Sequence, residues 1–184
     1  MNMTARHPFT LNRTGSRRHR IALIDGPNMS SLGARSKQVY GAIASLDDLK
    51  AFVTSAGSDI GVEVETFSSN HMGDILEYIH GSADRVDGYI INPAGLTTMG
   101  EAVRHALEDT TKPAIEVHFA NISGAPGTPR GLASGKLIST FTHTATGLCM
   151  GLRQYSYIAA LVGLVMALDD RGFLGGELAD LETA

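Results

Sequence analysis

Short apolar runs alternate with amphipathic segments along most of this chain, and the alternation predicts its secondary structure. Five runs have the length and apolar character of β-strands: residues 20–25, 62–67, 88–92, 114–118 and 146–151. Helical spacing predicts four helices, over residues 73–83, 100–108 and 155–168 and from a start at Ser45-Leu46. Strands that alternate with helices favour a parallel sheet with right-handed crossovers. The pattern therefore predicts an α/β domain with a five-stranded parallel sheet.

The two ends of the chain lack this pattern. Residues 1–19 carry a basic stretch that begins at Arg13, without the apolar core of a signal peptide, and we expect a disordered basic arm. The domain then occupies residues 20–170, and residues 171–184 are expected to form a frayed tail.

Composition excludes several function classes. The 184 residues are 43% hydrophobic and 18% charged, which is ordinary for a globular domain, and the net charge of −4 provides no basic field for nucleic acid. The longest apolar run, 158–168, is too short to cross a membrane, and the single Cys149 cannot form an internal disulfide. No metal-ligand spacing or phosphate-binding loop is present. We expect a cytoplasmic protein that binds neither nucleic acid nor membranes, and no metal.

Polar residues follow the first predicted strand, where open α/β sheets keep their chemistry. Gly26-Pro27-Asn28 interrupts the strand, and Arg35 and Tyr40 follow on a long connection. A tyrosine beside an arginine can act as a base, because a nearby cation favours the phenolate. The alternative is an ordinary connection with a solvated arginine and a packed tyrosine.

Two later strands also end in polar residues, at Asn92 and at the pair Glu116 and His118. Residues two apart on a strand leave the same face, so the carboxylate and the imidazole are expected to be neighbours. A carboxylate can orient an imidazole and keep it protonated. A structural pair without a catalytic role is the alternative.

These motifs, in this order, resemble the type II 3-dehydroquinate dehydratases over about residues 20–169. The motifs are Gly26-Pro27-Asn28 with Arg35 and Tyr40, Ser69-Asn70-His71, Asn92-Pro93-Ala94-Gly95, and Glu116-Val117-His118-Phe119-Ala120-Asn121. The resemblance implies a flavodoxin-like fold with helices on both faces of the sheet. It also implies a cofactor-independent enzyme, a small carboxylate substrate, and trimers that assemble into a dodecamer.

Members of that family eliminate water from 3-dehydroquinate through an enolate. The resemblance assigns Tyr40 as the base with Arg35 beside it, and Asn28 as the residue that holds a water near the enolate oxygen. It assigns His118 as the general acid, with Glu116 as its partner.

The resemblance also assigns the carboxylate end of the substrate site. Asn92 matches the amide that orients the substrate's hydroxyl and carboxylate, and the backbone N–H groups around Phe119 and Ala120 match the pair that holds the carboxylate. Ala120 replaces a serine of the family pattern, which a backbone donor tolerates.

The departures gather at the far end of the substrate site. Thr98 stands where the family pattern has a substrate-binding histidine, and His105 where it has an aspartate that reaches a neighbouring subunit. A Gly/Pro-rich segment at 123–136 replaces an arginine-rich lid, with Arg130 and Lys136 as candidate cations. A site built to bind hydroxyls is sensitive to such losses.

We therefore predict a dehydratase with preserved chemistry, altered substrate specificity and poor or undetectable turnover of 3-dehydroquinate. Drift within an ordinary dehydroquinase is the simplest alternative. An isomerase or hydrolase on the same scaffold and a non-catalytic relative also remain open. The intact tyrosine, arginine and histidine argue against a pure scaffold.

Overall fold

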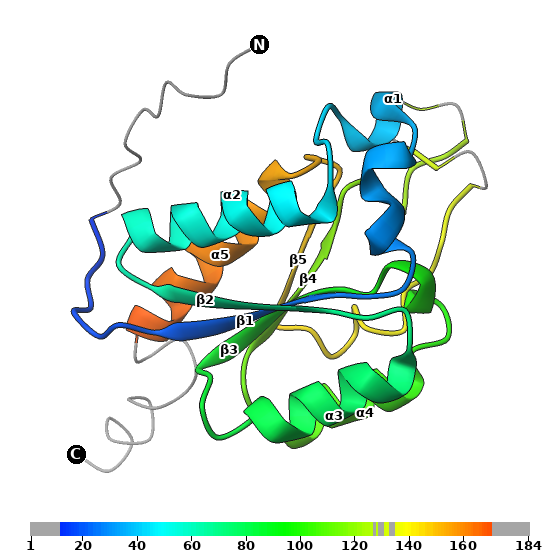
Figure 1. Ribbon diagram of the computed structural model, residues 1–184. Coiled ribbons are helices and arrows are strands. Elements are labelled where there is room, and N and C mark those ends of the chain that lie inside the picture. Colours follow the sequence, from blue (N-terminus) through cyan, green and yellow to red (C-terminus); the bar gives the residue numbers. More distant parts are fainter. Residues whose placement is uncertain (1–11, 127, 129–130, 133–134, 171–184) are drawn as a thin grey trace.

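Five parallel strands form the centre of the protein in a computed structural model that describes residues 12–126, 128, 131–132 and 135–170 (Figure 1). The strands are β1 Arg20–Asp25, β2 Glu63–Ser68, β3 Gly88–Asn92, β4 Ala114–His118 and β5 Gly147–Met150. They lie in the order β2-β1-β3-β4-β5, and every neighbouring pair is parallel. The α/β fold with a five-stranded parallel sheet is thus confirmed, and it is flavodoxin-like.

Helices cover both faces of the sheet, with α2 and α5 on one side and α3 and α4 on the other (Figure 1). The α-helices are α1 Lys37–Tyr40, α2 Leu46–Asp59, α3 Met72–Ser82, α4 Glu101–Asp109 and α5 Tyr155–Asp169. Two short 3-10 helices, η1 Met29–Ala34 and η2 Ala94–Leu96, follow β1 and β3. The predicted strands and long helices are confirmed to within about two residues at each end. The periodicity missed η1, α1 and η2, because such short elements have no repeating apolar face.

Alternation along the central strands divides the core into two layers. Ile21 and Leu23 of β1 pack with α2 and α5, whereas Ala22 and Ile24 pack with α3 and α4. All four side chains are fully buried, as expected for a parallel strand covered on both faces. Packing on both faces therefore fixes the ends of the strands, and with them the points at which the loops begin.

The end of the predicted N-terminal arm is already part of the folded domain, so the boundary at residue 19 is too late. Arg13 Nε donates to Asp169 Oδ2 over 2.7 Å, and the His19 Nε2 atom lies 2.8 Å from Asp169 Oδ1. Arg17 also reaches Asp87. The pattern missed these contacts because they join segments far apart in the sequence. Residues 1–11 and the expected tail at 171–184 lie outside the described residues.

The strand order places a topological switch point between β1 and β3. The chain leaves β1 toward β2 on one side of it and returns to β3 on the other, and open α/β sheets bind their ligands at the carboxyl ends of the strands at such a point. The loops that follow the two strands pack closely here. Gly26 N–H donates to the Asn92 carbonyl over 2.9 Å, and a Cβ at Gly26 would lie 2.3 Å from the Pro93 carbonyl oxygen. Only glycine allows this approach.

Candidate active site

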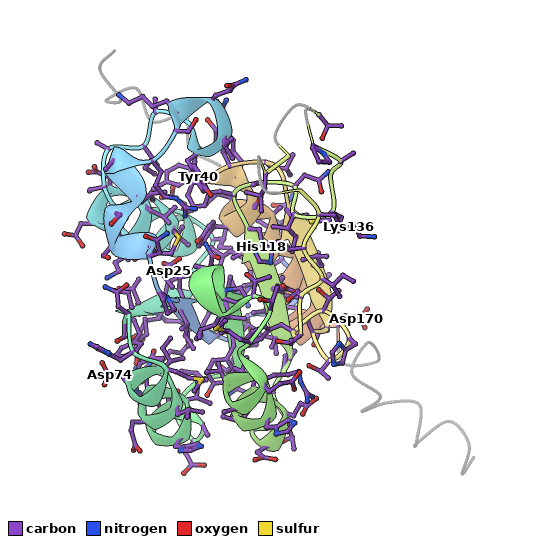
Figure 2. All side chains as sticks on the ribbon, turned by 90° about the vertical axis from the view of Figure 1, so that its right-hand side faces the viewer. Asp25, Tyr40, Asp74, His118, Lys136 and Asp170 are labelled. Atoms are coloured by element: carbon purple, nitrogen blue, oxygen red, sulfur yellow. The ribbon has the colours of Figure 1, made fainter. Side chains whose placement is uncertain are left out.

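The polar residues singled out in the sequence gather at the carboxyl ends of the strands. Figure 2 faces this edge of the sheet and shows Tyr40, Asp25 and His118 near its middle, Lys136 toward one margin, and Asp74 and Asp170 at the periphery. The loops after β1, β3 and β4 thus bring together groups that lie far apart in the chain.

Arg35, which follows η1, and Tyr40, the last residue of α1, form a contact pair in the connection after β1. The Arg35 guanidinium donates a hydrogen bond to the Tyr40 hydroxyl, and its Cζ lies 3.7 Å from the centre of the Tyr40 ring. Burial raises the pKa of Tyr40 above its ordinary value, and the positive charge of Arg35 lowers the pKa by a smaller amount. Arg35 thus favours the phenolate, as expected of a neighbouring cation, but burial outweighs its effect on the pKa of Tyr40.

Asn28 directly precedes η1 in a left-handed conformation, with φ of 76°, and it is exposed. Its backbone N–H donates to Asn70 Oδ1 over 2.8 Å, and the Asn70 amide in turn reaches Ser30. The loop from Gly26 to Asn28 is therefore held against both the β2–α3 turn and the loop after β3. Asn70 belongs to the Ser69-Asn70-His71 motif, whose role the sequence alone did not show.

Glu116 and His118 are the buried pair that their spacing predicted. His118 Nε2 lies 2.7 Å from Glu116 Oε1, and Thr142 donates to Glu116 Oε2 over 2.5 Å. Burial by itself would raise the pKa of Glu116, but hydrogen bonds from His118, Ser139 and Thr142 bring it below the ordinary value. Glu116 is thus an ionised acceptor that fixes the orientation of the imidazole. Ser139 and Thr142 were missed in the sequence because they come from a segment without strand or helix pattern.

Asn92, at the end of β3, holds its amide in a buried polar chain. Its Nδ2 donates to the Tyr157 hydroxyl over 2.7 Å, and Tyr157 donates to Asp25 Oδ1 over 2.6 Å. Asn92 Oδ1 accepts the Ala94 N–H at 3.1 Å. Sequence reasoning identified Asn92 but missed Asp25 and Tyr157. A carboxylate at the end of an otherwise apolar strand was the available signal for Asp25.

Phe119 and Ala120, the candidate carboxylate-binding positions, are buried directly after β4. The Phe119 ring links the two halves of the site, because its centre lies 6.0 Å from that of Tyr40. The Phe119 carbonyl accepts the backbone N–H of Arg153 over 3.1 Å. A residue whose backbone is proposed to hold a carboxylate therefore packs its ring against Tyr40.

Arg153 is a cation of this edge that sequence reasoning missed. It adopts a left-handed conformation, with φ of 57°, which is uncommon for a residue other than glycine and points to a functional constraint. Its guanidinium donates to the Gln38 carbonyl over 3.0 Å and so ties the segment that carries Tyr40 to the start of α5. The feature of the sequence that could have identified Arg153 is its position, three residues after the end of the last strand.

The residues at the departures from the family pattern lie on the surface. Thr98 and Lys136 are exposed, and the His105 side chain on α4 is 61% exposed, near Arg104 and Glu101. Arg130 lies outside the described residues. The structure thus brings the predicted catalytic set to one edge but leaves Thr98, His105 and Lys136 open to solvent on the single chain.

Two further features concern the kind of site that the chain can hold. Within the part of the chain that the structure describes, no three or more His, Cys, Asp or Glu side chains cluster as metal ligands would. In the same part, no helix has both the length and the apolar character needed to cross a membrane.

Known proteins resemble this chain over most of its length. Residues 19–165 match the family described as Dehydroquinase class II. The 3-dehydroquinate dehydratase of Halothermothrix orenii is 35% identical over 147 residues, which are 80% of this chain and 94% of that protein. Catabolic 3-dehydroquinase 1 of Neosartorya fischeri is 33% identical over 84% of this chain and 97% of its own. The crystal structure of the type II dehydroquinase from Propionibacterium acnes superposes with a TM-score of 0.70 at 31% identity, covering 80% of this chain and 96% of that one.

Proposed function

The chain belongs to the class II dehydroquinase family, and from this premise we propose that it eliminates water from a cyclic carboxylate related to 3-dehydroquinate, with recognition changed at the far end of the substrate. The observation that carries the proposal is the meeting of two pairs at one edge of the sheet. The Arg35–Tyr40 pair supplies a base with a cation beside it, and the buried Glu116–His118 pair supplies an oriented acid. Phe119 lies against Tyr40 and follows His118 directly, which supports a substrate position between the two pairs.

The reaction begins at Tyr40. Its phenolate takes a proton from the carbon next to the ketone, and the electron pair of that bond forms an enolate. Arg35 stabilises the phenolate, and a water held by Asn28 donates to the enolate oxygen, where a positioned donor lowers the barrier. His118 then protonates the departing hydroxyl, so water leaves as the ketone and a conjugated double bond form. Glu116 holds the imidazole in position through the contact between His118 Nε2 and Glu116 Oε1.

The two ends of the substrate meet different parts of the site. Asn92 and the backbone around Phe119 and Ala120 bind the carboxylate end, which is the part retained from the family pattern. At the far end, Thr98, His105 and the segment with Lys136 replace the family's ring-hydroxyl partners. A polar substrate group that loses its partner binds poorly, so this end selects a different molecule.

The test is a turnover assay with 3-dehydroquinate, followed through the ultraviolet absorbance of the conjugated enone product. We expect slow turnover that is clearly above the rate in buffer and requires Tyr40. Turnover that persists in the Tyr40→Phe variant, or none above the buffer rate even at high substrate concentration, would contradict the proposal.

Replacing Arg35 with alanine tests the electrostatic role of the cation. Arg35 lowers the pKa of Tyr40, so its removal should raise that pKa further. The rise of kcat/KM with pH that reports the base should then move to higher pH, and a move of about one pH unit should lower kcat/KM at neutral pH about tenfold. Arg85→Ala is a matched control, because Arg85 stacks on Tyr78 outside the site. A profile that does not move in Arg35→Ala would exclude this role.

We also expect trimers that assemble into a dodecamer. His105 is exposed on α4 and would then reach the site of a neighbouring subunit. Sedimentation velocity at the protein concentration of the assay measures this state directly. A stable monomer that is active at that concentration would contradict the assembly and would remove His105 from the site.

A further inference from the structure

A buried carboxylate, Asp25, lies behind the proposed substrate site and takes no part in the proton transfers above. Asp25 and Tyr157 are fully buried, and Asn92 is 3% exposed. The three side chains form one chain of hydrogen bonds, 2.7 Å from Asn92 Nδ2 to Tyr157 and 2.6 Å from Tyr157 to Asp25 Oδ1. Burying three polar side chains is costly unless each has partners, so the arrangement calls for an explanation.

The donors and acceptors of the three side chains fix which atom donates in each of these hydrogen bonds. An ionised carboxylate only accepts hydrogen bonds, so the Tyr157 hydroxyl must donate to Asp25. The Tyr157 oxygen then accepts, and only the Nδ2 side of Asn92 can donate to it. The other contact of Nδ2 is the Met29 sulfur at 3.3 Å. Both hydrogens of the Asn92 amide are therefore committed to the protein. Its oxygen accepts the Ala94 N–H at 3.1 Å and keeps a second lone pair that can accept from a substrate.

We propose that Asp25 is a positioning residue which, through Tyr157, turns the Asn92 amide so that its oxygen faces the substrate and accepts a hydrogen bond from a substrate hydroxyl. This inference rests on the proposed function, because it assumes that Asn92 contacts the substrate. It makes Asp25, outside the loops of the site, a determinant of which substrate group is recognised.

Protonation of Asp25 weakens its hold on the orientation of the Asn92 amide. A neutral carboxyl group can donate as well as accept, so Tyr157 can reverse its hydroxyl. The Asn92 amide is then held against turning over only by the Ala94 N–H that its oxygen accepts. Burial raises the pKa of Asp25 to about 7, opposed by the Tyr157 hydrogen bond and by the charge of Lys50 on α2. The positive charge of Arg35, on the loop after β1, also lowers the pKa of Tyr157, which burial and Asp25 raise. Asp25 Oδ2 has no hydrogen-bond partner within the described part of the chain. The amide is thus expected to be held more firmly as the pH rises through neutrality.

Two variants test the proposal. Asp25→Asn keeps the shape and an acceptor oxygen but cannot ionise, and Tyr157→Phe keeps the buried ring but cuts the chain of hydrogen bonds. In both, KM for 3-dehydroquinate should rise about tenfold at pH 8, the effect expected for one misdirected hydrogen bond, while kcat changes much less. In the wild type KM should rise as the pH falls below 7, and this dependence should vanish in both variants. Tyr89→Phe is the matched control, because its buried hydroxyl bonds Ser82 instead.

Infrared difference spectra between pH 5 and pH 8 report the proton on Asp25 without any turnover. The wild type should lose a buried carboxylic-acid carbonyl band as the pH rises, and Asp25→Asn should lack that change. A wild-type KM and KM–pH profile in Tyr157→Phe would overturn the inference, whether or not Asp25→Asn folds. Failure of the proposed function looks different, because it removes turnover of 3-dehydroquinate from the wild type itself.

Discussion

Tyr40→Phe is expected to lower kcat for 3-dehydroquinate by about a thousandfold while the fold and KM change little. A positioned general base contributes roughly a hundredfold to ten-thousandfold to a rate, and the Tyr40 hydroxyl is the titratable group that Arg35 contacts in the described part of the chain. The ring is kept, so its contact with Phe119 survives. Only the hydroxyl is lost, and with it the atom that takes the proton.

Stopped-flow absorbance of the enone product measures this loss, and circular dichroism reports the fold. Tyr78→Phe is the matched control, because that hydroxyl also bonds a charged side chain, Glu65, but lies between α3 and β2. Near-wild-type turnover in Tyr40→Phe would end the assignment of the base, and an equal loss in both variants would show a general effect on the fold.

The second large effect concerns recognition. We expect kcat/KM for 3-dehydroquinate to lie several orders of magnitude below that of the relative from Halothermothrix orenii measured alongside. A lost charge-assisted hydrogen bond costs about 1.5–3 kcal/mol, so two or three losses lower kcat/KM roughly a hundredfold to a millionfold. The positions concerned are Thr98, His105 and the segment at 123–136, where the family pattern supplies partners for the ring hydroxyls.

Repair of the two single positions makes this prediction specific. Thr98 is exposed at the turn between η2 and α4, and His105 is exposed on α4, so both positions accept other side chains without repacking the core. Thr98→His combined with His105→Asp should recover part of the activity if Lys136 or Arg130 supplies a cation. His80→Asp, on the exposed face of α3, controls for the added charge. An unrepaired kcat/KM equal to that of the relative would show that these substitutions are drift.

Local sequence pattern was sufficient to predict the sheet, its long helices and two side-chain contacts of the site. Strand alternation depends only on neighbours along the chain, so the spacing of Glu116 and His118 predicted their contact, which the structure confirms at 2.7 Å. The Arg35–Tyr40 contact was likewise predictable, since the two residues lie five positions apart on one loop. The catalytic roles proposed for these residues came from the resemblance to a family, because periodicity by itself does not indicate what a residue does.

Only the tertiary structure decided the partners that come from distant segments. Tyr157 lies 132 residues from Asp25, Arg153 lies 115 residues from Gln38, and Thr142 lies 26 residues from Glu116 across a segment without periodicity. It also decided that the pKa of Tyr40 is raised rather than lowered, because burial outweighs the charge of Arg35. Periodicity reports which face of an element is apolar, whereas desolvation and hydrogen bonding depend on which faces meet once the chain has packed.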